Sequence, residues 1–161
     1  MNSKPIVYFI SAIRGVRKRK ENVISLIQWL KELGVTILTE HVGANDPIEA
    51  QEKLFGKTKG SLTAEDIEKR DIAWLNQAEY VIAEISGAST GAGREIEYAR
   101  TKEHFGHKAA QILCLYHQED EFFASPMVRG MTKDRYKNVT ITAYQDIEQA
   151  KGIIKKFLEL E

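Results

Sequence analysis

The chain has 161 residues, which suits one domain, spanning residues 1–161, with a hydrophobic core of its own. Its 23 Lys and Arg residues balance its 23 Asp and Glu residues, so the formal net charge is zero, which argues against a protein that coats nucleic acid. The single cysteine, Cys114, excludes an internal disulfide, and no apolar run reaches the roughly 18 residues that a membrane span needs. We therefore expect a cytoplasmic protein that binds neither nucleic acid nor membrane.

Five short runs of β-branched and aromatic residues indicate strands, and they begin at Ile6, Val35, Tyr80, Ala110 and Val139. Several are apolar nearly throughout, as expected of strands covered on both faces. The spacing of apolar residues predicts helices over residues 19–33, 63–78, 92–104 and 145–160. Residues 119–134 look irregular. This alternation predicts an α/β fold, a single doubly wound (Rossmann-like or flavodoxin-like) five-stranded parallel sheet with helices on both faces.

The connection between the second strand and the second helix is unusually long. Residues 42–62 exceed the usual length of a connection in a domain of this kind. In doubly wound sheets, ligands bind at the carboxyl ends of the strands, where this connection begins. We interpret it as a binding loop or a lid.

Asp71 breaks the pattern of its predicted helix. It lies four residues after Ile67 and four before Leu75, so it belongs to the apolar stripe that should face the sheet. Burying an unpaired carboxylate is costly, so we expect Asp71 to be paired or to have a raised pKa. Two interpretations stay open, a functional carboxyl group or one tied to a neighbouring backbone group.

Glu95 and Tyr8 are two further candidates. Glu95 borders the inward side of its predicted helix and lies in the first turn, where the helix dipole favours an ionised carboxylate. That favourable position alone would also explain the residue. Tyr8 lies near the carboxyl end of the first strand, so its hydroxyl could reach the site, although many tyrosines are ordinary core residues.

The stretch from Ser89 to Gly93 supplies hydroxyl groups and unobstructed backbone N–H groups at a predicted helix start, which suits an anion. A glycine-rich turn with a serine or threonine cap would explain the same residues.

Two carboxyl groups in different environments, Asp71 and Glu95, fit chemistry at a glycosidic bond, where one carboxylate attacks the sugar and the other group protonates the leaving group.

The basic and histidine residues give weaker signals. The run "RKRK" at 17–20 is typical of a solvated turn at a helix start, although Arg17 could contact a phosphate. The four histidines, His41, His104, His107 and His117, show no metal-ligand grouping, so we expect no metal.

Five segments resemble the Rcl family, in order and in spacing, over nearly the whole chain. They are "YFISAIRG" at 8–15, "LTEHV" at 38–42, "RDIAWLNQAEYVIAEIS" at 70–86, "STGAGREIEYA" at 89–99 and "SPMVRG" at 125–130. Members of this family are 2′-deoxynucleoside 5′-monophosphate N-glycosidases, relatives of the nucleoside 2-deoxyribosyltransferases.

The resemblance implies cofactor-free hydrolysis of the N-glycosidic bond of a (deoxy)nucleoside 5′-monophosphate, through a covalent glycosyl-enzyme intermediate. Glu95 corresponds to the nucleophile, Asp71 to the acid that protonates the leaving base, and Tyr8 to the tyrosine that orients the nucleophile. The implied substrate-binding residues are Ser11, Ala12, Ile13, Arg14, Gly15, Arg17, His41, Ser89 and Gly91. Ser125, Pro126 and Met127 correspond to a segment that reaches into the neighbouring subunit's site, which implies a homodimer.

Two positions distinguish this chain within the superfamily. Ser89 stands where the deoxyribosyltransferases have an acidic residue, and a serine suits a phosphate because it donates a hydrogen bond and adds no repulsive charge. Ala12 replaces a serine of the family's nucleotide-binding turn and removes a donor. The alternatives are a transferase that moves deoxyribose between bases and a non-catalytic nucleotide sensor.

Overall fold

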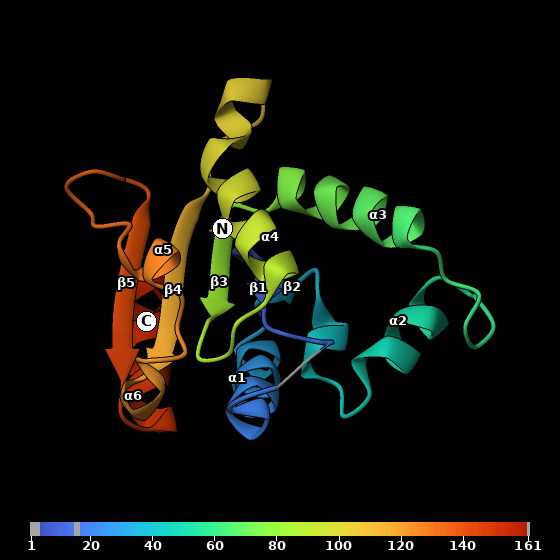
Figure 1. Cartoon of the computed structure of the whole chain (residues 1–161), viewed down its shortest axis with the longest axis horizontal. Helices are drawn as coiled ribbons and strands as arrows, with labels where there is room; N and C mark the ends of the chain where they lie inside the picture. The colour runs from blue at the N-terminus through green and yellow to red at the C-terminus, as the bar shows by residue number, and fades with distance from the viewer. Residues whose placement is uncertain (1–3, 15–16, 161) are drawn as a thin grey trace.

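A parallel sheet of five strands forms the centre of the computed structural model, which describes residues 4–14 and 17–160. The strands are β1 (Ile6–Ile10), β2 (Thr36–Ile37), β3 (Tyr80–Glu84), β4 (Gln111–His117) and β5 (Val139–Tyr144). Their order is β2-β1-β3-β4-β5, with every neighbouring pair parallel (Figure 1). This confirms the predicted doubly wound sheet and places the switch point between β1 and β3.

Helices cover both faces of the sheet (Figure 1). One core lies under α1 (Lys20–Glu32) and α6 (Ile147–Phe157), and the other lies under α3 (Ala64–Gln77) and α4 (Thr90–Thr101). Because side chains alternate along a strand, β1 contributes to both cores, with Val7 and Phe9 in the first and Tyr8 and Ile10 in the second. All four predicted helices are therefore present.

Shorter helical segments complete the chain. They are the 3₁₀ turns η1 (Glu40–Gly43), η2 (Lys102–Phe105) and η3 (Gln118–Asp120), and the short helix α5 (Pro126–Arg129). The helix predicted over 92–104 begins earlier, at Thr90, because Ser89 caps it, and its last turn is the 3₁₀ turn η2. No helix of the described ranges is long and apolar enough to cross a membrane.

The second strand is much shorter than its apolar run predicted. The hydroxyl group of Thr39 accepts a hydrogen bond from the backbone N–H of Phe9 at 2.8 Å and donates one to the Phe9 carbonyl at 2.7 Å. The Thr39 side chain thus occupies the N–H and the carbonyl group of Phe9 that would otherwise pair with β2. The chain after Ile37 turns into η1 and does not continue the pairing with β1. The run from Val35 to Val42 predicts a longer strand, and that prediction is wrong for this reason.

Residues 42–62 are predicted to form a loop, but part of this long connection is helical. It contains α2 (Pro47–Leu54), which has proline at its first position. Asp46 caps this helix, because its carboxylate accepts a hydrogen bond from the Glu49 N–H. In Figure 1, α2 lies beside the N-terminal part of α3, away from the strands β3 to β5. Through Gln51, α2 adds a wall to the cavity at the carboxyl ends of the strands.

Candidate active site

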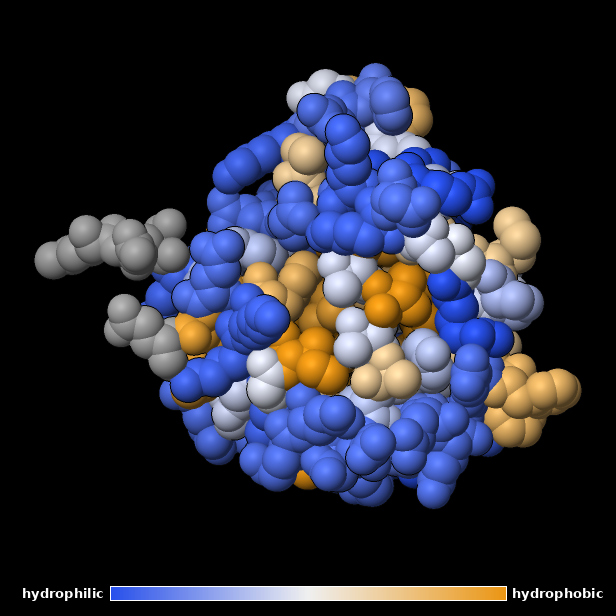
Figure 2. Space-filling view, turned by 90° about the vertical axis from the view of Figure 1, so that its left-hand side faces the viewer, coloured by the Kyte–Doolittle hydropathy of each residue, from blue (hydrophilic) through white to orange (hydrophobic). Residues whose placement is uncertain are grey.

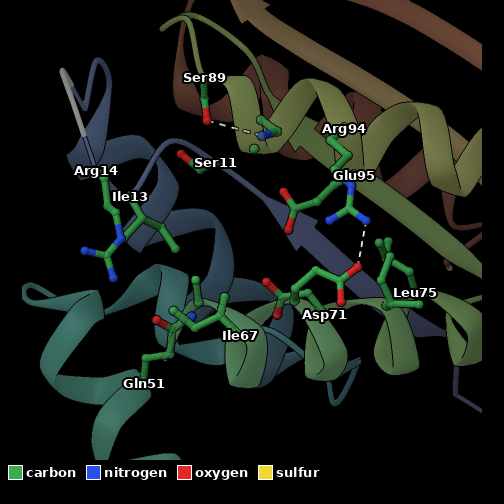
Figure 3. A pocket seen from close by; sticks show the side chains of 15 residues that line it. Ser11, Ile13, Arg14, Gln51, Ile67, Asp71, Leu75, Ser89, Arg94 and Glu95 are labelled. Carbon is green, nitrogen blue, oxygen red and sulfur yellow. Dashed lines mark hydrogen bonds and ion pairs between the residues drawn. The ribbon is translucent and has the colours of Figure 1, made fainter. Parts of the chain in front are cut away.

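A cavity of about 370 Å³ opens at the switch point between β1 and β3 (Figure 3). A volume of this size suits a small organic ligand. The loop after β1, helices α2 and α3 and the first turns of α4 supply its walls. Its lining residues are Ser11, Ile13, Arg14, Gln51, Ala64, Ile67, Glu68, Asp71, Ile72, Leu75, Ser89, Gly91, Ala92, Arg94 and Glu95.

Tyr8 and Glu95 form the most direct contact of the site. The buried hydroxyl group of Tyr8 donates a hydrogen bond of 2.6 Å to Oε1 of Glu95. Burial raises the pKa of Tyr8, so the phenol stays protonated and remains a donor. Burial also raises the pKa of Glu95 to about 7, while the bond from Tyr8 opposes this shift by favouring the ionised carboxylate. The pair thus holds a carboxyl group that titrates near neutral pH.

Asp71 lies across the cavity from Glu95 (Figure 3). Burial raises its pKa, and the hydrogen bonds and the positive charge of Arg70 act in the opposite direction. Arg70 donates to Oδ1 of Asp71 from Nη2 at 2.6 Å and from Nε at 3.0 Å. The expectation that Asp71 is paired or has a raised pKa is confirmed, and its partner is a guanidinium group instead of a backbone group.

Ser89 and Gly91 line one end of the cavity, at the start of α4. The Ser89 hydroxyl oxygen accepts a hydrogen bond from the Ala92 N–H at 3.2 Å and so caps the helix. The hydroxyl hydrogen remains available to a ligand, and the dipole of a 12-residue helix favours negative charge here. A Cβ atom built on Gly91 would have only the Ser89 oxygen within 4 Å, at 3.9 Å. The cavity is therefore open directly above this turn.

Ser11, Ile13 and Arg14 line the cavity from the loop after β1, as the resemblance implied. Figure 3 shows Ile13 facing Ile67 of α3, with Gln51 of α2 beside them. These side chains form a mainly apolar wall, in which the amide of Gln51 is a polar group. Gly15 lies outside the described residues.

Three other expected positions lie outside this main cavity. Ala12 is buried and does not line it. Arg17 donates to the backbone carbonyl groups of Val42 at 2.8 Å and Ala44 at 3.4 Å, so it ties the first loop to η1. His41 lines a smaller neighbouring cavity together with Tyr8, Asp71 and Glu95. Burial lowers the pKa of His41 to about 4, which keeps the ring neutral.

Ser125, Pro126 and Met127 do not line the cavity of their own chain. They lie at the start of α5, on the β5 side of the molecule (Figure 1). The Met127 side chain is 85% exposed. Within the described residues, no group of three His, Cys, Asp or Glu side chains could hold a metal ion.

Sequence reasoning missed several residues of the site, namely Gln51, Phe55, Glu68, Arg70 and Arg94. Arg94 of α4 donates to Glu68 of α3 at 2.6 Å, an ion pair that spans one mouth of the cavity (Figure 3). Both belong to helix faces that carry ordinary charged residues, so no pattern marked them. Asp46 followed by Pro47 was a usable signal for α2, since a cap followed by proline is typical of a helix start.

Comparisons with known proteins identify the family, although no protein-family profile matches the chain. Two relatives bear the name "Putative 2′-deoxynucleoside 5′-phosphate N-hydrolase 1". The one from Thermofilum pendens is 33% identical over 144 residues, which cover 89% of this chain and 88% of the relative. The one from Trichoplax adhaerens is 34% identical over 155 residues, or 96% of this chain and 94% of the relative.

Two further comparisons agree with this result. The human 5-hydroxymethyl-dUMP N-hydrolase is 32% identical over 127 residues, which cover 79% of this chain and 66% of the human protein. Among solved structures, a CMP N-glycosidase from Clostridium botulinum superposes with a TM-score of 0.60 over 94% of this chain and 98% of its own, at 16% identity, which shows a shared fold. This chain belongs to the 2′-deoxynucleoside 5′-phosphate N-hydrolase family and is an enzyme of the glycosidase type.

Proposed function

We propose that the chain hydrolyses the N-glycosidic bond of 2′-deoxynucleoside 5′-monophosphates to a free base and deoxyribose 5-phosphate. The observation that carries this proposal is the hydrogen-bonded pair Tyr8–Glu95 facing Asp71 within one cavity whose other end is a capped helix N-terminus. Two carboxyl groups with different partners suit a retaining glycosidase, and the helix start suits a phosphate. The names of the relatives support the same class of substrate.

The first half of the proposed reaction breaks the bond to the base. A carboxylate oxygen of Glu95 attacks C1′ of the sugar, the C1′–N bond breaks, and its electron pair goes to the base nitrogen. Asp71, protonated at this step, gives its proton to the leaving base. Tyr8 holds Glu95 by the bond to Oε1, which leaves Oε2 as the attacking oxygen.

The second half returns the enzyme to its starting state. A water molecule loses a proton to the Asp71 carboxylate and adds to C1′, and the ester bond to Glu95 breaks. Deoxyribose 5-phosphate leaves, and both carboxyl groups regain their initial protonation. Asp71 therefore acts first as an acid and then as a base.

The cavity suggests one direction for the nucleotide. The phosphate would occupy the α4 N-terminus near Ser89, Gly91 and Arg14, and the sugar would lie between Asp71 and Glu95. The base would then insert between Ile13 and Ile67, with its edge toward Gln51. Two facing aliphatic side chains suit a flat ring, and an amide can donate to or accept from its edge.

We also propose that the enzyme works as a homodimer in which Ser125, Pro126 and Met127 complete the partner's site. Large hydrophobic side chains are exposed next to this segment, with Phe122 88% and Met127 85% exposed. Figure 2, which looks onto the β5 side of the molecule, shows hydrophobic residues gathered in a hollow with a hydrophilic border. Such a patch is typical of an interface between proteins.

Buried, unpaired Cys114 fits a reducing compartment such as the cytoplasm.

The test is incubation of the protein with each deoxynucleoside 5′-monophosphate, with CMP and with 5-hydroxymethyl-dUMP, followed by chromatography of the products. The proposal predicts free base and sugar 5-phosphate from at least one nucleotide, and much slower cleavage of the matching nucleoside. A second free base is added in a parallel reaction. A new nucleoside or nucleotide there would identify a transferase, and tight binding without any product would identify a sensor.

A further inference from the structure

Arg70 is a nearly buried arginine directly behind the site. Its side chain is 9% exposed and lies on α3, one residue before Asp71. The guanidinium carbon lies 4.4 Å from the ring centre of Trp74, also on α3, and 4.8 Å from that of Phe55, just after α2. Cation–π contacts with two rings hold the guanidinium group in one place. Nη1 is buried and has no hydrogen-bond partner among the described residues.

The contact between Arg70 and Asp71 is one-sided. Both donors, Nε and Nη2, bond to Oδ1, and Oδ2 receives no hydrogen bond from Arg70. The usual bidentate arrangement of arginine and carboxylate would engage both oxygens. Arg70 therefore fixes one oxygen of Asp71 and leaves the other oxygen to the groups that face it across the cavity, among them the Tyr8 hydroxyl.

We propose, on the basis of the proposed function, that Arg70 is a positioning residue that fixes Asp71 through Oδ1 and keeps this carboxyl group able to act as both acid and base. It needs no contact with the substrate for this role. Phe55, supplied by the segment after α2, assists by holding the guanidinium group against Asp71.

The charges around Asp71 show why such a residue is needed. Asp71 faces Tyr8 of β1, Glu95 of α4, His41 of η1 and, on its own helix, Glu68 and Arg70. Burial and the neighbouring carboxyl groups favour the protonated form, and His41 is neutral. The hydrogen bonds and the charge of Arg70 favour the ionised form most strongly, and the Tyr8 hydroxyl group favours it as well.

The two halves of the reaction place opposite demands on Asp71. Departure of the base needs the proton, and activation of water needs the carboxylate. Without Arg70, burial would raise the pKa of Asp71 further and leave less of the carboxylate that the second half needs. Base departure would still occur, but the glycosyl-enzyme would accumulate because water is activated slowly.

The experiment compares Arg70→Met with Lys69→Met, a matched control on the same helix whose side chain is 71% exposed. We expect Arg70→Met to release free base in a burst close to one equivalent and then to turn over roughly tenfold more slowly at pH 7. We also expect the alkaline limb of the kcat/KM profile to move up by about one pH unit, since loss of a nearby opposite charge shifts a pKa by about that much or more. Lys69→Met should match the wild type in both respects.

Two further variants refine the test. Arg70→Lys keeps the charge without the fork of donors and should fall between Arg70→Met and the wild type. Phe55→Ala removes one ring and should shift the alkaline limb in the same direction, though less. The proposal would be overturned if kcat/KM fell at every pH in Arg70→Met, Arg70→Lys and Phe55→Ala while the alkaline limb stayed in place. That result would indicate a merely structural role.

A measurement without turnover separates this proposal from the proposed function. The Asp71 carboxyl carbon is titrated by ¹³C NMR in the wild type, Arg70→Lys and Phe55→Ala, with Asp71→Asn used for assignment. A higher midpoint in both variants supports the role of Arg70, even if no nucleotide is hydrolysed. Equal midpoints in all three folded proteins would refute it, even if the wild type is an active hydrolase.

Discussion

The Tyr8 hydroxyl donates to Oε1 of Glu95 across 2.6 Å and joins two residues that lie 87 positions apart in the chain. The bond orients the carboxylate and favours its ionised form. Tyr8→Phe should therefore reduce kcat/KM by about 10- to 100-fold, since a hydrogen bond to a charged group contributes roughly 1.5–3 kcal/mol. The acid limb of the kcat/KM profile should move to higher pH, because Glu95 must be ionised to attack and its pKa of about 7 would rise further without the bond.

A matched control for this variant is Tyr144→Phe. The Tyr144 hydroxyl also donates to a buried carboxylate, that of Glu84, at 3.2 Å, but neither residue lines the cavity. This control should lose stability and leave the acid limb where it is. An acid limb that moves equally in both variants would contradict the role given to Tyr8.

Ser89 offers a test of phosphate recognition that preserves the fold. Ser89→Asp retains an N-cap residue for α4 but places a negative charge where we propose that the phosphate binds. We expect kcat/KM for nucleoside 5′-monophosphates to fall by about 100-fold, because like charges in contact cost several kcal/mol. Activity on the matching nucleosides should not fall. Equal losses on nucleotides and nucleosides, measured side by side, would place the phosphate elsewhere.

Gln51 tests where the base lies. Its side chain is only 3% exposed, and its amide nitrogen lies 3.4 Å from Nε2 of the neutral His41 ring. Gln51→Leu should raise KM by about tenfold for the preferred nucleotide and flatten the differences between bases, since one neutral hydrogen bond contributes about 1 kcal/mol or somewhat more. Leu54→Ala, an exposed position on the same helix, is the control. An unchanged base preference would exclude Gln51 from base recognition.

Lys102 tests what holds α3, and with it Asp71, in place. This fully buried lysine donates from Nζ to the carbonyl oxygens of Leu75 at 2.7 Å and Ala78 at 2.6 Å, at the end of α3. Lys102→Met would leave these buried acceptors unpaired, and we expect the free energy of unfolding to fall by about 2–4 kcal/mol. Lys108→Met, at a position 76% exposed, should change it by less than about 0.5 kcal/mol. Urea denaturation measures both, and equal small losses would contradict this role.

Much of the fold could be predicted because its signals are local. Runs such as Ile6–Ile10 are buried on both faces of a parallel sheet and read as apolar throughout. Asp71 and Glu95 stood out because each carboxyl group lay on or beside the apolar face of a helix. The early end of β2 depends on the contact of Thr39 with Phe9, which lies 30 residues away in the sequence.

The parts that could not be predicted depend on tertiary packing. Arg70 reads as an ordinary charged residue of a helix, and its role arises only when α2 brings Phe55 onto its guanidinium group. Glu84 likewise ends an apolar strand without any pattern that marks it. Burial nonetheless raises its pKa to about 7 within a network that includes Ser86 and Tyr144.

The covalent bond that we propose between Glu95 and the sugar can be observed directly. The most direct test mixes excess enzyme with a cleaved nucleotide, quenches the reaction over a series of early times, and measures the masses of the proteolytic peptides. We expect a deoxyribose 5-phosphate adduct on the peptide that contains Glu95, rising as free base appears and then decaying, and no adduct with Glu95→Gln. Two results would contradict a covalent role for Glu95. One is complete release of base while the Glu95 peptide stays unmodified at every time, and the other is full turnover by Glu95→Gln.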